Sequence, residues 1–495
     1  MVKAKKQSPD WPAELKNWSR QNFIKSLFKR FTKAEIFLVG GAVRDALLSR
    51  PTADFDFVVR GVGKAELEKF LAKQGKVNLV GKKFGVFKFR PKNWGKPEID
   101  IALPRTEHSL HLSGVYRDFK INSNAKLKIE DDLSRRDFTV NAMAWDIKNS
   151  QLIDPFGGQI DLKKKIVRAV GEPKIRFQED YSRMLRAIRF ACQLGFEIEQ
   201  KTWQEIKAKI KNLTKLNQGQ PIIAAEVIAK ELVKMVQANP RMAIELLDAS
   251  GGLKILMPEL LEMKGCPQPQ NWHSEGDVWQ HTLLSLKKLQ TKEFKKEFST
   301  APVTNEVIWG LIFHDVGKPP TLIKTDRLRF NGHDIASAKR FHKIAERWKL
   351  ASAGLNVEVV DQIIAKHMLP THGVENMRET TIERYFFNDN FPGRELLMLI
   401  FADISATVPP SGKPDFGSYK NLKARIAKLQ VKGKNKRTLP RPLVNGHDLI
   451  KNFKLPSGPA IGQWLEILRE AQLAGKIKTK KQGLELIGKK IKKDR

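Results

Sequence analysis

Residues 38–59 read LVGGAVRDALLSRPTADFDFVV, and this stretch decides the fold of the first part of the chain. An apolar strand is predicted to end at Gly40-Gly41, and the residues that follow have helical spacing. A second strand is predicted to contain Asp54 and Asp56 at alternate positions. Because successive side chains of a strand point to opposite faces, both carboxylates are expected on one face.

Paired carboxylates suit hard divalent cations that act on a phosphoryl group. A D-x-D tripeptide is frequent by chance, so the reading depends on the preceding glycines: Gly41 and Arg44 are expected where a triphosphate would lie. A third carboxylate is expected from a neighbouring strand, and Asp100 has the right alternation to serve as general base for an attacking hydroxyl. An ordinary solvent-facing acid is the alternative for Asp100.

Charge indicates a polyanionic partner. The 495 residues contain 89 Lys and Arg against 54 Asp and Glu, a formal net charge of +35. Such an excess favours nucleic acid, with solubility or a membrane surface as the alternatives. The chain has only two cysteines, Cys192 and Cys266, too few for a disulfide framework, so a cytoplasmic location is expected. No apolar run is long enough to predict a membrane span.

Several motifs, taken in order, carry a resemblance to a known family. The sequence resembles the class II tRNA nucleotidyltransferase and bacterial poly(A) polymerase family of the polymerase-β superfamily. The segments that match are Leu38–Leu48, Asp54–Asp56, Arg135–Ala144, Asp154–Gly158 and Glu179–Phe190.

The resemblance implies roles for residues in the later motifs. Arg136, Asp137 and Asn141 are implied to contact the ribose and triphosphate, and an Arg fork suits phosphate well.

The stretch from Glu179 to Phe190 is predicted to be one helix. By resemblance, Asp180 and Arg183 bond the Watson–Crick edge of the incoming base, and Arg186 helps to hold the nucleotide. Arg offers only donors and Asp only acceptors, so the pair can complement cytosine or adenine. A surface ion pair is the alternative for an isolated helix.

The polar segment from Thr106 to Ile129 is also implied to matter. In the family a flexible loop here governs the switch from CTP to ATP, and its full length in this chain disfavours an enzyme that adds only the two cytidines. A plain surface loop is the alternative reading.

A second group of residues resembles the HD phosphohydrolase superfamily. His and Asp side chains at this spacing suit one or two hydrolytic metals such as Mg²⁺, Mn²⁺, Ni²⁺ or Co²⁺. Some bacterial tRNA nucleotidyltransferases carry such a domain with phosphatase or 2′,3′-cyclic phosphodiesterase activity, and residues 272–281 fit that subgroup. The expected ligands are His281, His314, Asp315, His333, His367 and Asp403.

Together these patterns predict an α+β chain: a polymerase-β-type nucleotidyltransferase head with a mixed sheet, an all-α neck and body, and an all-α HD domain. The expected parts are a basic N-terminal extension (1–35), the head (36–170), a helical neck (171–265), the HD domain (266–406), and a linker with a basic helical tail (407–495).

The predicted activity is addition of CCA to the 3′ end of tRNA from CTP and ATP, with Mg²⁺ in the head. Contact with the 3′ end and acceptor stem of tRNA is expected, and no membrane partner. Two alternatives stay open: poly(A) or A-only addition, and a phosphohydrolase whose head only binds RNA.

Overall fold

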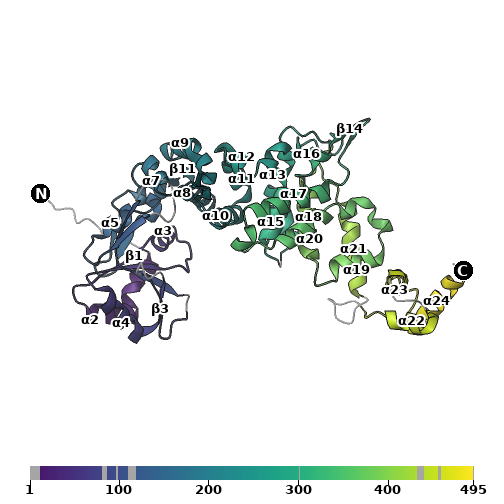
Figure 1. Cartoon of the computed structure of the whole chain (residues 1–495), viewed down its shortest axis with the longest axis horizontal. Helices are drawn as coiled ribbons and strands as arrows, with labels where there is room; N and C mark the ends of the chain where they lie inside the picture. The colour runs from purple at the N-terminus through teal and green to yellow at the C-terminus, as the bar shows by residue number, and fades with distance from the viewer. Residues whose placement is uncertain are drawn as a thin grey trace. The chain divides into compact units, whose positions relative to one another are not determined.

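The computed structural model describes residues 12–80, 86–95, 98–109, 119–299, 301–431, 440–454 and 459–493. Part of the segment implied to govern nucleotide choice, residues 110–118, lies outside them. The chain divides into two compact units, Met1–Leu256 and Met257–Arg495. Figure 1 shows a sheet followed by helices in the first unit and a helical second unit. No helix within the described ranges is long and apolar enough to cross a membrane.

The first unit is built on one mixed sheet of seven strands, in the order β3-β4-β5-β2-β1-β8-β9. Strand β1 pairs antiparallel with β2 and β8, whereas the central strand β2 runs parallel to β5. This mixed sheet and the helices that follow it confirm the predicted α+β class. The strand bounds are β1 Glu35–Val39, β2 Asp56–Arg60, β3 Gly75–Val80, β4 Val86–Pro91, β5 Ile99–Ala102, β8 Ala144–Asp146 and β9 Gln151–Ile153.

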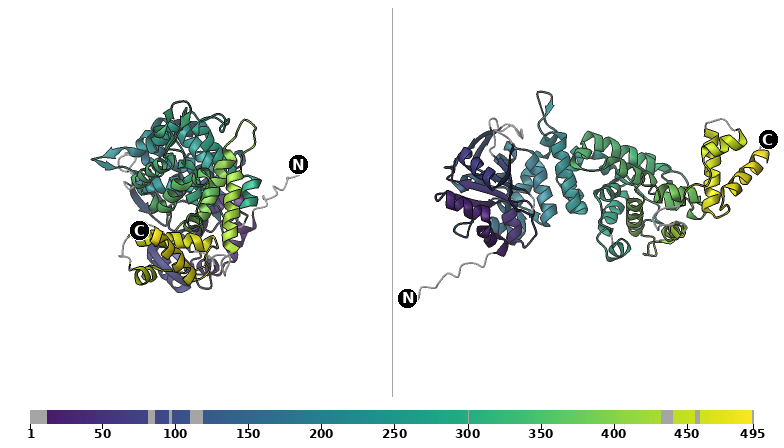
Figure 2. Two further views of the ribbon diagram at one scale, coloured as in Figure 1. Left: turned by 90° about the vertical axis from the view of Figure 1, so that its right-hand side faces the viewer. Right: turned by 90° about the horizontal axis from the view of Figure 1, so that it is seen from below.

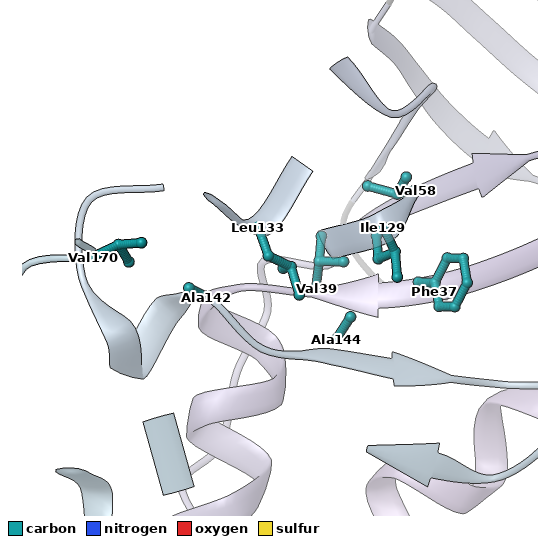
Figure 3. Packing of buried hydrophobic residues seen from close by; sticks show 8 residues of the cluster. All are labelled: Phe37, Val39, Val58, Ile129, Leu133, Ala142, Ala144 and Val170. Carbon is teal, nitrogen blue, oxygen red and sulfur yellow. The ribbon is translucent and has the colours of Figure 1, made fainter. Parts of the chain in front are cut away.

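One face of the sheet carries an apolar cluster beneath helix α5 (Ile129–Ser134). Phe37 and Val39 of β1 and Val58 of β2 pack there with Leu133 of α5, as Figure 3 shows. Asp56 is directly opposite Val39 in the β1–β2 pairing, so its side chain belongs to this same face.

The N-terminal helices cover the opposite face. The ring of Trp18 meets the rings of Phe55 and Phe57 edge-on, each with centroids 4.8 Å apart. Phe23 of α2 (Asn22–Arg30) packs against Phe57 and Phe89. Figure 2 shows these helices, in purple, lying against the sheet. The apolar residues spaced among the charges of this segment therefore belong to the core of the head.

The strand predicted from Asp54 begins two residues later, at Asp56. The backbone N–H of Asp54 bonds the Thr52 hydroxyl (3.3 Å) in a local turn, whereas the parallel ladder starts where the Asp100 N–H donates to the Phe55 carbonyl (3.0 Å). Side-chain alternation therefore does not by itself place Asp54 beside Asp56.

The rest of the first unit is helical apart from short ladders. α8 packs against α10, and both helices bury an apolar stripe, which is why their long periodic sequences form helices. The helix bounds are α3 Gly41–Leu47, α4 Lys64–Gln74, α6 Gly158–Lys164, α7 Pro173–Glu179, α8 Ser182–Leu194, α9 Gln200–Lys209, α10 Ala225–Ala238, α11 Pro240–Ala249 and α12 Gly252–Leu256. The ladders are β6 Arg105–Ser109 with β7 Phe119–Ser123, β10 Ile166–Val167 with β11 Glu197–Ile198, and β12 Leu216–Asn217 with β13 Gln220–Pro221.

The second unit has a bundle in which α13 and α15 contact α20, and α17 and α15 contact α18. Its bundle helices are α13 Val278–Lys288, α14 Lys292–Glu297, α15 Asn305–Phe313, α16 Lys318–Thr321, α17 His333–Arg347, α18 Val357–Lys366 and α20 Gly393–Ala406. A hairpin of β14 Ile323–Lys324 and β15 Leu328–Arg329 precedes α17. The C-terminal helices are α19 Glu379–Phe386, α21 Gly417–Val431, α22 Gly446–Phe453, α23 Pro459–Leu473 and α24 Lys480–Lys493; α23 packs on α19.

Candidate active site and candidate metal centre

The predicted carboxylates meet where β2 and β5 run side by side. Asp56 and Asp100 are direct partners in the parallel register, although 44 positions separate their numbers. The next strand, β4, places Lys88 opposite Asp100, and its Nζ lies 3.2 Å from an Asp100 oxygen. A row of two acids and one ammonium therefore crosses three strands on the face that carries α5.

The pKa of Asp56 reflects this crowding. Burial raises the pKa to about 6, and the charge of Arg136 opposes the rise. The carboxylates of Asp54 and Asp100 add to the rise, because like charges disfavour ionisation. Such a group of acids gains most from a divalent cation, which neutralises the repulsion, so the residues present fit a metal.

A second part of the site surrounds the Gly-Gly turn. Gly40 has φ +72°, and a Cβ there would lie 2.5 Å from Nη1 of Arg136, so only glycine lets this guanidinium approach the turn. Arg44 donates from Nη1 to Oδ1 of Asn141 (2.6 Å), and its other nitrogens bond Asp45. Two guanidinium groups thus stand beside one turn, as anion binding requires.

Asp137 organises the site from within. Its Oδ2 accepts from Nε and Nη2 of Arg186 (2.9 and 2.5 Å), and its Oδ1 accepts from Asn141 (3.2 Å). Burial alone would raise the pKa of Asp137, but the charge of Arg186 and these bonds lower it to about 2. Its carboxylate oxygens are therefore engaged by protein donors, and its contribution in this state is to hold Arg186 and Asn141.

The expectation of one helix from Glu179 to Phe190 is wrong. α7 ends at Glu179, Asp180 has an extended backbone (φ −157°, ψ 106°), and α8 begins at Ser182. The reason is local: Oδ1 of Asp180 accepts from the N–H of Ser182 (2.8 Å), a bond that competes with continued helix. Arg183 and Arg186 remain together on α8, while Asp180 precedes it.

Arg183 is held from several sides. Its Nη1 donates to Oε2 of Glu179 (2.5 Å) and to the Arg176 carbonyl (3.2 Å), and Nη2 donates to the Arg135 carbonyl (3.4 Å). Arg183 is only 7% exposed, so its orientation is set before any base arrives. Glu179 is the first residue of the Glu179–Phe190 motif, but it was not predicted as a site residue. Its i,i+4 spacing to Arg183 is the sequence feature that indicates their ion pair.

The six expected metal ligands come together in the second unit. His281 lies on α13, His314 and Asp315 directly follow α15, and Asp403 lies on α20. His333 is the first residue of α17, and His367 directly follows α18. They form two groups of possible ligands, His281 with His314 and Asp403, and Asp315 with His333 and His367.

The imidazole rings point toward one centre. In His314, His333 and His367, Nδ1 lies 2.7 to 2.9 Å from the backbone carbonyl three residues earlier. A carbonyl can only accept, so these nitrogens carry the hydrogen and leave Nε2 as the basic atom. Nε2 of His333 and Nε2 of His367 are then 3.2 Å apart with lone pairs facing one another, an arrangement that a cation between them relieves.

Carboxylates complete the centre. Asp315 is buried, and neither of its oxygens has a hydrogen-bond partner among the described residues, although Nζ of Lys318 lies 2.7 Å from Oδ2 and Nε2 of His333 lies 3.4 Å from Oδ1. These are ion-pair distances without hydrogen-bond geometry. Nε2 of His281 lies 2.9 Å from Oδ1 of Asp403. Buried oxygens without bonds, beside basic nitrogens, fit divalent metal.

Protons partly balance the charge of this centre. Burial lowers the pKa of His314, but Asp315 and Asp403 together raise it to about 10. The pKa of His367 falls to about 4, through burial and the neighbouring charges of His333 and His314. At neutral pH the carboxylates therefore keep His314 protonated while His367 is neutral, so this centre favours positive charge.

Three residues near this centre were not predicted as site residues: His273, Glu275 and Lys318. Glu275 bonds the Nδ1 atoms of His273 and His281 (2.7 and 2.8 Å). Burial alone would raise the pKa of Glu275, but these bonds lower it to about 2. Both His273 and Glu275 fall within the 272–281 stretch, whose likeness to known sequences was the only signal.

Three family models match the chain: the poly A polymerase head domain over residues 36–168, the HD domain over 282–387, and a putative tRNA nucleotidyltransferase domain 2 over 412–487. The multifunctional CCA protein of Neisseria gonorrhoeae is 35% identical over 353 residues, 70% of this chain and 77% of that protein. That of Pseudoalteromonas atlantica is 34% identical over 322 residues, 64% and 71% of the two chains.

Solved structures share the fold along nearly the whole length. The Bacillus stearothermophilus CCA-adding enzyme in complex with CTP superposes with a TM-score of 0.66 at 23% identity, covering 99% of both chains. The Thermotoga maritima CCA-adding enzyme complexed with tRNA gives 0.58 at 21% identity, covering 97% and 98%.

Proposed function

Since the chain belongs to the family of multifunctional CCA proteins, we propose that it is a template-independent nucleotidyltransferase that adds C, C and A to the 3′ end of tRNA from CTP and ATP. The observation that carries this proposal is the pairing of Asp56 with Asp100 across adjacent strands, beside the turn that Arg44 and Arg136 flank. Binding the 3′ end and acceptor stem of tRNA agrees with the net charge of +35.

The carboxylates act on the reacting atoms. Asp54 and Asp56 would hold Mg²⁺, which supplies Lewis-acid stabilisation of the charge that develops on the α-phosphoryl group. Asp100 takes the proton of the RNA 3′-hydroxyl as that oxygen attacks the α-phosphate, and pyrophosphate leaves. Lys88 pairs with the Asp100 carboxylate at 3.2 Å.

The arginines bind and orient the nucleotide. Arg44 and Arg136 meet the triphosphate beside Gly41, with Asn141 between them. Arg186, fixed by Asp137, supports the nucleotide from α8.

The base is read by Asp180 and Arg183. Arg183 can only donate and is already oriented by Glu179, while Asp180 can only accept. This donor and acceptor pair stands in for a nucleic-acid template, because it complements the polar edge of cytosine and, rearranged, that of adenine.

The second unit is proposed to be a metal-dependent phosphohydrolase. His281, His314, Asp315 and Asp403 would hold one divalent metal, and His333 with His367 allows a second next to Asp315. Mg²⁺, Mn²⁺, Ni²⁺ and Co²⁺ all suit imidazole and carboxylate ligands. When bound, the metal supplies an activated water for attack on a phosphate ester.

We propose a cytoplasmic location because neither cysteine forms a disulfide. Cys192 and Cys266 are both free and buried, and burial raises the pKa of both thiols. Unpaired thiols suit a reducing compartment.

The test of the head uses three tRNA transcripts that end before the first C, after one C and after both. Each is incubated with Mg²⁺ and CTP, ATP or both, and the 3′ ends are sequenced. We expect stepwise C, C and A, followed by arrest. Addition of A alone, or a tail that does not stop, assigns the A-adding or poly(A) activity instead. No incorporation with intact phosphohydrolase activity assigns RNA binding to the head.

A further inference from the structure

Glu275 lies outside the proposed ligand set, yet it bonds one of its members. It sits in the loop before α13, where its side chain is 5% exposed. Oε1 lies 2.8 Å from Nδ1 of His281 and 2.7 Å from Nδ1 of His273. The other nitrogen of His281, Nε2, faces Asp403 at 2.9 Å.

The second oxygen of Glu275 reaches another part of the bundle. Oε2 accepts from the N–H of Val408 (3.0 Å), two residues beyond the end of α20, the helix that carries Asp403. Ser274 also bonds Val408, because its N–H and its hydroxyl each donate to the Val408 carbonyl at 2.7 Å. Glu275 thus connects the start of α13 with the end of α20.

His281 has a different partner from the other three histidines of the centre. His314, His333 and His367 each direct Nδ1 at the carbonyl three residues earlier. The corresponding carbonyl for His281 belongs to Val278, and it accepts instead from the Thr282 hydroxyl (2.9 Å). His281 therefore depends on a side chain to fix its tautomer.

We propose that Glu275 is a positioning residue of the metal centre, which holds the hydrogen of His281 on Nδ1 and so presents Nε2 as the metal-binding atom. A metal held on Nε2 would leave the hydrogen of His281 on Nδ1, where the Glu275 carboxylate can accept it at 2.8 Å. This inference rests on the proposed function of the second unit as a metal-binding domain.

The expected loss of metal affinity follows from the general effect of carboxylates that orient metal-binding histidines. Removing the group that orients a ligand imidazole lowers metal affinity by roughly 10- to 100-fold, because the ring turns and the wrong nitrogen can carry the hydrogen. Loss of the link to Val408 alone has no such effect on the imidazole. The bond of Glu275 to His281 can therefore be tested apart from its bond to Val408 by comparison with Ser274, which bonds Val408 only.

The experiment compares Glu275→Ala, Glu275→Gln and Ser274→Ala in the full chain, with Asp54→Asn and Asp56→Asn added so that the head binds no metal. Mn²⁺ affinity is measured by isothermal titration calorimetry. Ser274→Ala is the matched control, because it removes a bond to Val408 and leaves His281 untouched. Thermal unfolding without metal reports the structural effect of each change.

We expect Glu275→Ala to bind Mn²⁺ roughly 10- to 100-fold more weakly, and Ser274→Ala to bind it like the parent. Glu275→Gln should fall between, since its amide oxygen can still accept from His281 but is a weaker acceptor than a charged carboxylate. Parent-like binding by both Glu275 variants, or equal losses in Glu275→Ala and Ser274→Ala, overturns the inference.

A second measurement keeps the inference testable should Glu275→Ala not fold. In the chain loaded with diamagnetic Mg²⁺, ¹⁵N resonances should show His281 with the hydrogen on Nδ1 and none on Nε2, and Glu275→Gln should change this pattern. If the parent itself binds no Mn²⁺, and His314→Ala changes nothing, the proposed metal site fails instead of the role of Glu275.

Discussion

At the scale of single residues, the ionised Asp56 carries an electrostatic cost in the head. It lies on a packed sheet face, opposite Asp100 and near Asp54, and burial is the main reason that its pKa rises to about 6. A carboxyl whose folded pKa exceeds its unfolded value binds protons more tightly in the folded chain, so ionisation disfavours folding. Repulsion between the carboxylates therefore destabilises the metal-free site, and a bound cation would reduce that repulsion.

Asp56→Asn should stabilise the metal-free head at neutral pH. Between the ordinary pKa near 3.8 and the folded value of about 6, stability of the wild-type chain falls as pH rises. The advantage of the variant should grow from about pH 4 and level off above about pH 6, reaching on the order of 3 kcal/mol at most. Thermal unfolding in EDTA at a series of pH values measures it. An advantage independent of pH would contradict the assignment, and added Mg²⁺ should favour only the wild type.

Arg183→Ala should relax the choice between CTP and ATP more than it weakens triphosphate binding. One good side-chain contact to a base edge is worth about 1 to 3 kcal/mol of discrimination, so the ratio of kcat/KM values should fall about tenfold. Arg176 remains to pair with Glu179 (3.0 Å), so the local structure survives. Single-nucleotide kinetics on tRNA lacking only the last base measure the ratio. Arg136→Ala is the contrasting variant and should raise KM for both nucleotides; an unchanged ratio in Arg183→Ala would refute the templating role.

At the scale of elements, the N-terminal helices and the sheet depend on one another. Trp18 is 6% exposed and packs on Phe55 and Phe57, which lie on either side of Asp56 in the chain. The Asp56 side chain belongs to one face of the sheet while these rings pack on the other, so β2 carries both a site carboxylate and a core contact. The segment between Pro12 and Arg30 thus supports the site although it contributes no group to it.

Trp18→Ala should destabilise the head by about 3 kcal/mol, since a large buried aromatic side chain leaves a cavity. Hydrogen–deuterium exchange of amides in β1 and β2 measures the loss locally, and exchange there should accelerate. Ile160→Ala is the control on the same unit, because Ile160 is 58% exposed and its truncation should change stability little. Equal protection in both variants would mean that the N-terminal helices are not needed by the sheet.

At the scale of the whole molecule, the two candidate sites lie in separate compact units. Asp54, Asp56 and Asp100 belong to the first unit, whereas His281 to Asp403 belong to the second. Each site is assembled within its own unit, and each unit has a buried hydrophobic cluster of its own. The two activities should therefore be separable by substitution.

Asp56→Asn should lower nucleotide addition by about a thousandfold or more, because the carboxylates act together on the reacting phosphate. It should leave metal-dependent hydrolysis of p-nitrophenyl phosphate or a 2′,3′-cyclic nucleotide intact. His314→Ala should do the reverse. Gel assays of tRNA extension and colorimetric phosphate release on the same preparations measure both. Loss of both activities in either variant would contradict two independent sites.

The sequence by itself determined the residue types and local order of both sites. Acids beside a Gly-Gly turn and the His-Asp pair are properties of a few neighbouring positions, and the α+β class follows from periodicity, which is also local. The resemblance to known families extended this to roles. It could not show that α7 ends at Glu179, because the bond from Ser182 to Asp180 competes with a helix whose periodic pattern continues unbroken.

Only the tertiary structure decided which distant residues meet. Asp100 is opposite Asp56 because β2 and β5 pair in parallel, and no periodicity specifies the register between two strands. Asp137 turned out to hold Arg186, and Glu275 to hold His281, because burial forces each charged group to find a partner. Which partner each charged group finds depends on how the chain packs in three dimensions. The ligand-type residues could therefore be predicted from the sequence, whereas the residues that orient them could not.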